Sequence, residues 1–400
     1  MFVIILDGLG VGDLPDSRAF GDEGRNTLAN LAAAVGGLAL PTLAGLGLGR
    51  VQAWHGLDLD RPVQGGFARL AAKSPGKDST TGHWELMGLV LDRPFPLFPQ
   101  GFPVPLLEEL TQRTGFGFIG NVAASGTEII ERLGDEHRET GKLIVYTSAD
   151  SVFQVAAHEE RLPVTGLYAF CAEARALLQG EFGVSRVIAR PFTGRSGNYR
   201  RSAGRRDFSL PPPGETLLDR LLAAGLPVIG IGKVRDLFAG RGFSTHVPSK
   251  GNEECMASLR EVQARSARAG LVLANLIDFD MLWGHRRDPA GYAEGLRVFD
   301  RWLAGFLADM GPRDWLFITA DHGNDPTGPG SDHTREYVPL LARGPEVREA
   351  RDLGRRESFA DLAATLAEAF ALPVTGAGRS LWAALREAPQ SAASEEERHG

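Results

Sequence analysis

The chain has 400 residues, 23% of them charged, and a formal net charge of −7 at pH 7. This length favours two domains, and the negative charge argues against general nucleic-acid binding, which needs a basic surface. No stretch reaches the ~18 apolar residues of a membrane span. The two cysteines, Cys171 and Cys255, match no zinc or disulfide pattern, so we expect buried thiols in a cytoplasmic protein.

The first predicted element is a strand over residues 2–6. These residues are continuously apolar and largely β-branched, which is typical of a strand covered on both faces. The strand leads into Asp7 and a glycine-rich loop, where Asp7 is either a turn residue or part of a functional site. Apolar residues at helical spacing then predict a helix over about 27–35.

A polar segment rich in hydroxyl groups follows at residues 73–84. Its three adjacent hydroxyls belong to Ser79, Thr80 and Thr81. They either cap a helix that begins near Gly82 or supply a nucleophile. Both roles are compatible, because a helix N-terminus favours a phosphate on the capping hydroxyl.

Two proline-rich segments, at about 93–105 and 210–214, enclose the middle of the chain. Clustered prolines are typical of linkers, so residues 94–212 are predicted to form an inserted α+β domain. Its predicted elements are a helix near 104–113, a strand at 142–147, a helix near 167–178 and a strand at 184–189.

The insert also carries polar residues that suit a phosphate or sugar ligand. Ser148 and Asp150 directly follow the strand at 142–147, and residues 186–206 include seven arginines. Guanidinium groups pair well with phosphate. A solvated basic loop explains most of these arginines, so we expect one or two to contact a ligand.

Helix and strand patterns alternate after the second proline segment, as in an α/β fold. The predicted elements are a helix over 216–225, a strand over 227–233 ending in Lys233, a strand over 271–278, a helix over about 290–310, strands over 315–320 and 337–343, and a helix over 358–371. Residues 1–93 and 213–386 are predicted to form one discontinuous core. The polar tail, 387–400, is predicted to be disordered.

Three of the predicted strands end in carboxylates, and histidines follow two of them. The residues are Asp7, Asp278, Asp280, Asp321, His285, His322 and His333. If the strands are parallel neighbours in an open sheet, their carboxyl ends meet at one edge. Buried carboxylates repel one another unless cations neutralise them. One Asp from each strand and three His would suffice for two metal ions with three ligands each.

The alternative is that each Asp caps a helix and each His is incidental, which explains single residues better than the whole set.

Two metals bridged by a hydroxyl nucleophile suit phosphoryl transfer, because they lower the hydroxyl pKa and neutralise the phosphoryl oxygens. The hydroxyls at 79–81 and the arginines of the insert would then serve as nucleophile and phosphate ligands.

Long motifs throughout the chain resemble those of the phosphopentomutases, a family of the alkaline phosphatase superfamily. They lie at residues 76–85, 124–129, 144–151, 157–160, 187–192, 279–289 and 319–326. The resemblance implies an α/β fold: an alkaline-phosphatase-like core with a mostly parallel sheet and helices on both faces, plus an inserted α+β cap domain. It also implies interconversion of α-ribose 1-phosphate with ribose 5-phosphate, and of the 2-deoxyribose pair. No obligate protein partner is implied.

The resemblance further implies roles for individual residues. Two Mn²⁺ ions would be held, one by Asp7, Asp321 and His322, the other by Asp280, His285 and His333. The family nucleophile is a threonine after Lys-Asp, which is Ser79 here, with Thr80 as the alternative. The sugar phosphate would contact Ser148, Asp150, Arg190, Arg205 and Lys233. A sugar bisphosphate would prime the phosphoenzyme, and Asp332 would be no ligand.

Three other functions fit part of the pattern. A phosphoglycerate mutase that needs no cofactor bisphosphate uses the same superfamily fold, with serine as its usual nucleophile. A metal-dependent phosphomonoesterase or phosphodiesterase is the second alternative. A non-enzymatic, metal-stabilised binding protein is the third, although an intact ligand set is unusual for a dead site.

Overall fold

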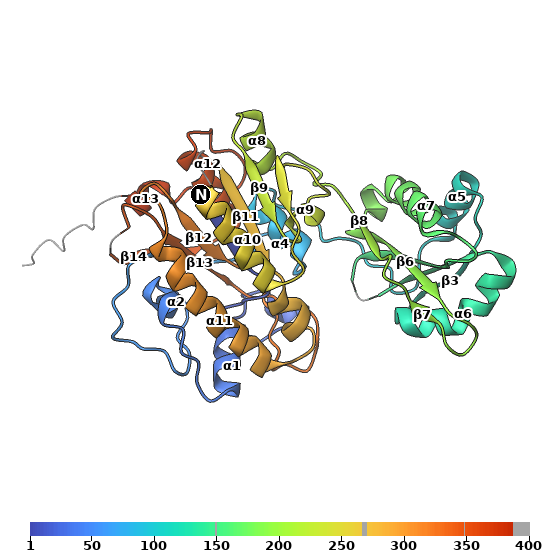
Figure 1. The fold of residues 1–400 in the computed structure, drawn as a ribbon, viewed down its shortest axis with the longest axis horizontal. Coiled ribbons are helices and arrows are strands. Elements are labelled where there is room, and N and C mark those ends of the chain that lie inside the picture. The colour runs from blue at the N-terminus through green and yellow to red at the C-terminus, as the bar shows by residue number, and fades with distance from the viewer. Residues whose placement is uncertain (149, 266–269, 348, 387–400) are drawn as a thin grey trace, which may run out of the picture. The chain divides into compact units, whose positions relative to one another are not determined.

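The computed structural model describes residues 1–386 except 149, 266–269 and 348. Its chain forms two compact units (Figure 1). The first comprises Met1–Asp92, Pro213–Arg235 and the chain from Arg241 onward; the second comprises Arg93–Pro212 and Asp236–Gly240. Residues 387–400, which are predicted to be disordered, lie outside the described residues.

An eight-stranded sheet forms the centre of the first unit, in the order β10-β9-β11-β1-β12-β13-β2-β14. Its strands are β1 (Phe2–Leu6), β2 (Gly66–Leu70), β9 (Val228–Ile231), β10 (Thr245–Val247), β11 (Leu271–Leu276), β12 (Leu316–Thr319), β13 (Val338–Arg343) and β14 (Arg351–Arg356). The strands from β10 to β12 are parallel, whereas β13 is antiparallel to both of its neighbours. Every residue of β1, β11 and β12 is buried, as the continuous apolar runs predict.

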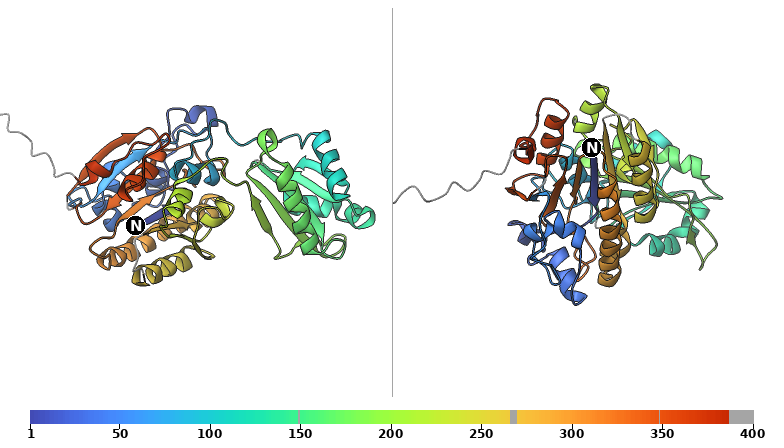
Figure 2. Two further views of the ribbon diagram at one scale, coloured as in Figure 1. Left: turned by 90° about the horizontal axis from the view of Figure 1, so that it is seen from above. Right: turned by 60° about the vertical axis from the view of Figure 1, so that its left-hand side comes forward.

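Helices cover both faces of this sheet (Figure 2). The first unit contains η1 (Ser17–Phe20), α1 (Thr27–Ala34), α2 (Pro41–Gly45), α3 (Leu48–Val51), α4 (Ser79–Leu86), α8 (Leu217–Ala223), α10 (Asn252–Arg265), α11 (Pro289–Ala308), α12 (Ala360–Ala369) and α13 (Trp382–Arg386). The residues of the short α9 (Val234–Leu237) are divided between the two units. The longest, α11, buries Tyr292, Phe299 and Phe306 along one face at helical spacing. No helix among the described residues is long and apolar enough to cross a membrane.

The second unit is a six-stranded mixed sheet with helices on each face. Its strands are β3 (Phe118–Ala123), β4 (Leu143–Thr147), β5 (Val152–His158), β6 (Arg186–Thr193), β7 (Arg200–Arg201) and β8 (Arg206–Ser209). The helices are α5 (Val104–Thr114), α6 (Gly126–Thr140), α7 (Val164–Leu177) and the short η2 (Gly180–Phe182).

Successive side chains of β4 point to opposite faces of the sheet and belong to two separate hydrophobic cores. Leu143 and Val145 pack with α5 and α7 on one face, whereas Ile144 and Tyr146 pack with α6 on the other. The unit therefore has a hydrophobic core of its own.

The predicted fold class is confirmed: an α/β core sheet that is mostly parallel, and a second unit in which helices pack on a mixed sheet. The expected elements are present within a few residues of their predicted bounds. The largest differences at the start of an element are two or three residues: the helix predicted near Gly82 begins at Ser79, the helix predicted near 167–178 begins at Val164, and the strand predicted at 184–189 begins at Arg186 (β6). Both cysteines are buried, as expected.

Candidate active site and metal centre

Three neighbouring parallel strands bring the predicted carboxylates to one edge of the sheet. Asp7 follows β1, and Asp321 lies just beyond β12. Asp280 lies in a π-helical turn, η3 (Phe279–Gly284), that follows β11. At most 4% of the surface of each residue is exposed. The expected convergence of these carboxylates at one sheet edge is therefore found.

One ligand group gathers around His322. Its Nε2 atom lies 3.3 Å from Asp7 Oδ1 and 3.3 Å from Asp321 Oδ2. The three side chains offer atoms that all lie within 4.8 Å of one another, close enough to bind a single ion. This is the group that the resemblance implies for the first metal.

A second ligand group surrounds Asp280. His333 Nε2 lies 3.3 Å from Asp280 Oδ1, and His285 Nε2 lies 3.2 Å from Asp280 Oδ2. The atoms within 4.8 Å of one another here belong to Asp280, His322 and His333, so His322 adjoins both groups. The imidazole of His285 is 38% exposed and approaches from the solvent side.

The charges of this cluster favour a bound cation. Burial, together with the charges of Asp321 and Asp280, raises the pKa of Asp7. Burial alone would lower the pKa of His322, but the surrounding carboxylates outweigh it and raise that pKa to about 10. The carboxylates thus create a negative potential at this edge of the sheet, which favours a bound cation.

Several buried ligand atoms of the cluster have neighbouring carboxylate or imidazole atoms at 3.1–3.3 Å but no well-aligned hydrogen bond. They are Asp7 Oδ1, Asp321 Oδ2 and His333 Nε2. Buried polar atoms are normally satisfied by a partner. Oxygen and imidazole nitrogen are the donors that divalent ions such as Mn²⁺ and Zn²⁺ accept, so the residues present fit a metal pair.

Ser79 lies beside this cluster at the first position of α4. Its Oγ is 3.1 Å from His322 Nε2. The helix cap is Asp78, whose side chain accepts a hydrogen bond from the Thr81 backbone N–H, and Thr81 Oγ1 donates to the same carboxylate. Asp78 therefore performs the capping role that the sequence left open for the hydroxyls, and the Ser79 hydroxyl faces the metal ligands.

The comparisons with known proteins address this site directly. A family model described as "Metalloenzyme superfamily" matches residues 220–374, which include Asp280, Asp321 and the three histidines His285, His322 and His333. The phosphopentomutase of Carboxydothermus hydrogenoformans is 51% identical over 96% of this chain and 99% of its own length. The chain belongs to the phosphopentomutase family. Members of this family are enzymes, and this one has the ligand groups of a divalent-metal site.

A second curated relative has the same name. The phosphopentomutase of Desulfitobacterium hafniense is 51% identical over 92% of this chain and 94% of its own length. Among solved structures, a phosphoglycerate mutase of Leishmania mexicana is 14% identical, with a TM-score of 0.48 over 95% of this chain and 96% of that one.

The residues expected to bind the sugar phosphate lie in both units of this phosphopentomutase-family chain. In the second unit, Arg190 donates from Nε and Nη2 to Gln154 Oε1 at 3.1 and 3.0 Å. Arg205 donates to both oxygens of Asp207 at 2.8 Å. The exposed Asp150 forms an ion pair with Arg186 at 3.6 Å. Ser148, two residues before Asp150 in the sequence, is half-buried.

Lys233 belongs to the first unit. It is half-buried and lies two residues after the end of β9, at the same sheet edge as the carboxylates. Asp332, which the sequence left outside the ligand set, is mostly exposed and lies 3.6 Å from the Lys77 ammonium.

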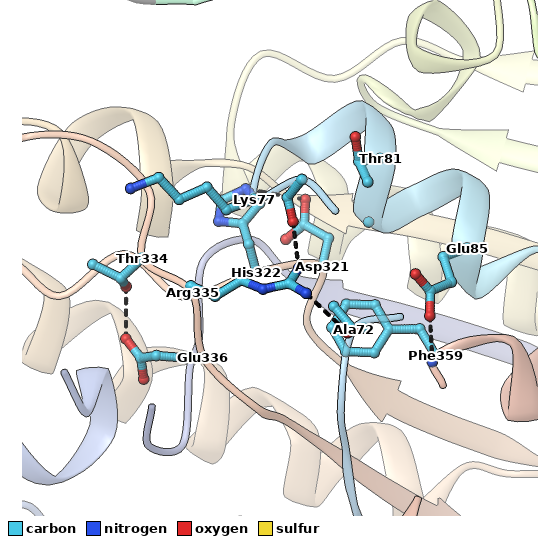
Figure 3. Close-up of a pocket in the computed structure, with 12 residues that line it drawn as sticks. Ala72, Lys77, Thr81, Glu85, Asp321, His322, Thr334, Arg335, Glu336 and Phe359 are labelled. Carbon is cyan, nitrogen blue, oxygen red and sulfur yellow. Dashed lines mark hydrogen bonds and ion pairs between the residues drawn. The ribbon is translucent and has the colours of Figure 1, made fainter. Parts of the chain in front are cut away.

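Residues that support helix α4 were not predicted from the sequence. Glu85, on α4, is fully buried and accepts a hydrogen bond from the backbone N–H of Phe359 (Figure 3). It also accepts hydrogen bonds from the backbone of Lys73 and Ser74 and from the Ser358 hydroxyl. Arg335 donates to the carbonyls of Ala72, Ser74 and Gly76, just before Ser79. These contacts fix the segment that presents the Ser79 hydroxyl.

We expect Glu85→Ala to lower the free energy of unfolding by about 3–5 kcal/mol. The truncation leaves several buried donors without an acceptor, and each costs about 1–3 kcal/mol. Urea unfolding measures the change. The matched control is Glu357→Ala, which removes a carboxylate that is 82% exposed and is expected to cost less than about 0.5 kcal/mol. Equal losses in the two variants would contradict the anchoring role of Glu85.

Proposed function

We propose that the chain interconverts α-D-ribose 1-phosphate and D-ribose 5-phosphate, and the 2-deoxyribose pair, through a phosphorylated Ser79. The observation that carries this proposal is the 3.1 Å contact between Ser79 Oγ and His322 Nε2, at the edge of a buried carboxylate–histidine cluster. A hydroxyl at a helix N-terminus is also well placed for a phosphate, because backbone N–H groups and the helix dipole favour the anion.

We propose two Mn²⁺ ions as the cofactors, held by Asp7, Asp321 and His322 and by Asp280, His285 and His333. When bound, divalent ions neutralise charge on phosphoryl oxygens and lower the pKa of a coordinated hydroxyl. The remaining work falls to the chain itself. Helix α4 fixes the Ser79 hydroxyl, and the burial of the cluster limits access of water to it.

The proposed reaction transfers phosphoryl groups twice. Phosphorylated Ser79 gives its phosphoryl group to the free hydroxyl of the sugar phosphate, so one P–O bond breaks at Ser79 Oγ and another forms on the sugar. The resulting bisphosphate returns its other phosphoryl group to Ser79. A sugar bisphosphate is the proposed activator, because it can phosphorylate a Ser79 that has lost its phosphate.

The proposed sugar-phosphate ligands are Ser148, Asp150, Arg190, Arg205 and Lys233. Arg190 supports this role by its surroundings: burial and the nearby charge of Arg205 lower its pKa. Two neighbouring guanidinium groups repel each other through their positive charges, and an anion such as phosphate reduces this repulsion. A cytoplasmic location remains part of the proposal.

Turnover of purified protein with Mn²⁺ and a trace of sugar bisphosphate tests the function. Ribose 5-phosphate and ribose 1-phosphate are expected to interconvert, and 3-phosphoglycerate is expected to stay unchanged. Isomerisation of 3-phosphoglycerate alone would favour a phosphoglycerate mutase. Release of inorganic phosphate as the main product would favour a phosphomonoesterase.

A further inference from the structure

Each carboxylate of the metal cluster is held by a donor that carries no charge of its own. Asn275 Nδ2 donates to Asp7 Oδ2 at 2.8 Å, and Asn324 Nδ2 donates to Asp280 Oδ1 at 2.6 Å. Asp321 Oδ1 accepts the backbone N–H of Gly8 at 3.2 Å. The two asparagines thus serve different carboxylates, and those carboxylates belong to different ligand groups.

Asn324 is held firmly in its place. Its backbone N–H donates to the Gly8 carbonyl at 2.8 Å and lies 3.2 Å from Thr27 Oγ1. A Cβ atom at Gly284 would come within 2.5 Å of the Asn324 amide group, and one at Gly8 within 3.0 Å of its Cβ. The lack of side chains at both glycines makes room for Asn324 next to Asp280.

Asn275 is held by the sheet itself. It is a fully buried amide within the otherwise apolar strand β11, where its register partner on β1 is Ile5, two residues before Asp7. The amide donates to Asp7 Oδ2, while Asp7 Oδ1 faces the other ligand side chain, His322, whose Nε2 lies 3.3 Å away. One oxygen of Asp7 is thereby oriented and the other stays available to an ion.

We propose that Asn275 and Asn324 are positioning residues that act on different metal ions: Asn275 on the ion of Asp7, Asp321 and His322, and Asn324 on the ion of Asp280, His285 and His333. The inference rests on the two-metal site of the proposed function. A neutral amide suits this task, because it orients a carboxylate without neutralising the charge that attracts the cation.

Counting bound ions tests the inference without measuring turnover. Mn²⁺ titration by calorimetry, with metal analysis of the dialysed protein, is expected to show two ions on the wild-type chain. Asn324→Ala is expected to keep one site at wild-type affinity and to weaken the other by about 10–100-fold. Asn275→Ala is expected to show the same pattern for the opposite site.

The His285→Ala background identifies which ion each asparagine serves. Because this variant already weakens the Asp280 site, adding Asn324→Ala is expected to cause little further loss, whereas adding Asn275→Ala weakens the remaining ion. Loss of both ions in equal measure from either asparagine variant, or no change in either, would overturn the inference.

Two further measurements separate positioning from folding. Circular dichroism of the metal-free variants is expected to match wild type, and Asn324→Ser takes the place of Asn324→Ala if the latter does not fold. At saturating Mn²⁺ the kcat of Asn324→Ala is expected to recover, which a general structural defect would prevent. If the wild type binds two ions but each asparagine variant weakens both of them equally, only this inference fails. If the wild type binds no ion, the proposed metal site fails as well.

Discussion

Ser79→Ala is expected to lower turnover by at least about a thousand-fold and to abolish the phosphoenzyme. The substitution removes the hydroxyl whose Oγ lies 3.1 Å from His322 Nε2. It leaves the carboxylates and imidazoles of the cluster unchanged, so the variant is expected to bind its metal ions. Intact mass spectrometry after incubation with a sugar bisphosphate measures the phosphoenzyme, and peptide mapping locates the phosphate.

Thr80→Ala is the matched control, since it removes the neighbouring buried hydroxyl from the same turn of α4. We expect this variant to retain the phosphoenzyme and most of its turnover. A phosphate mapped to Thr80 in the wild type, or a Ser79→Ala variant that still becomes phosphorylated, would show that the nucleophile is another residue.

Removal of the metal ions is expected to abolish activity and to destabilise the first unit. Asp7, Asp280 and Asp321 then repel one another in a buried site. An ion present at about a thousand times its Kd stabilises the folded state by about 4 kcal/mol per site, and chelation removes this contribution. Hydrogen exchange after EDTA treatment measures the change locally. Amides of β1, β12 and residues 321–336 are expected to lose protection, and Mn²⁺ should restore both protection and activity.

The second unit provides the control within the same molecule. Both ligand groups found among the described residues lie in the first unit, so β4 and β5 should exchange at the same rate with and without metal. Uniform loss of protection in both units would indicate global unfolding by the chelator. Unchanged protection around Asp321 would contradict the metal site.

The sequence pattern predicted the strands at the centre of the sheet because their buried residues form continuous apolar runs. β1, β11 and β12 are such strands, and the carboxylates predicted at their ends do converge at one edge of the sheet. β2 and β14 were not predicted. β14 reads Arg-Asp-Leu-Gly-Arg-Arg and lies at the sheet edge, where charged residues are tolerated and the apolar signal is lost.

The supporting contacts of the site could not be predicted from one sequence. Glu85 meets Phe359 across 274 residues, and Asn275 meets Asp7 across 268. Such partners are determined by the order of strands in the sheet, which local periodicity does not encode. A local signal did exist for Asn275, because a lone amide within the apolar run Leu271–Leu276 is unusual for a buried strand.

The strand order has a consequence for how the molecule is made. Gly8 and Asp321 hydrogen-bond across 313 residues, and β1 lies between two strands that are translated near the other end of the chain. Residues 93–212 are contiguous, so the cores of the second unit can form on the ribosome as soon as that stretch emerges. The central sheet must wait for β12, and its long-range pairings are intrinsically slow. The carboxylate–histidine cluster, whose last residue is His333, can therefore come together only after the second unit is able to fold.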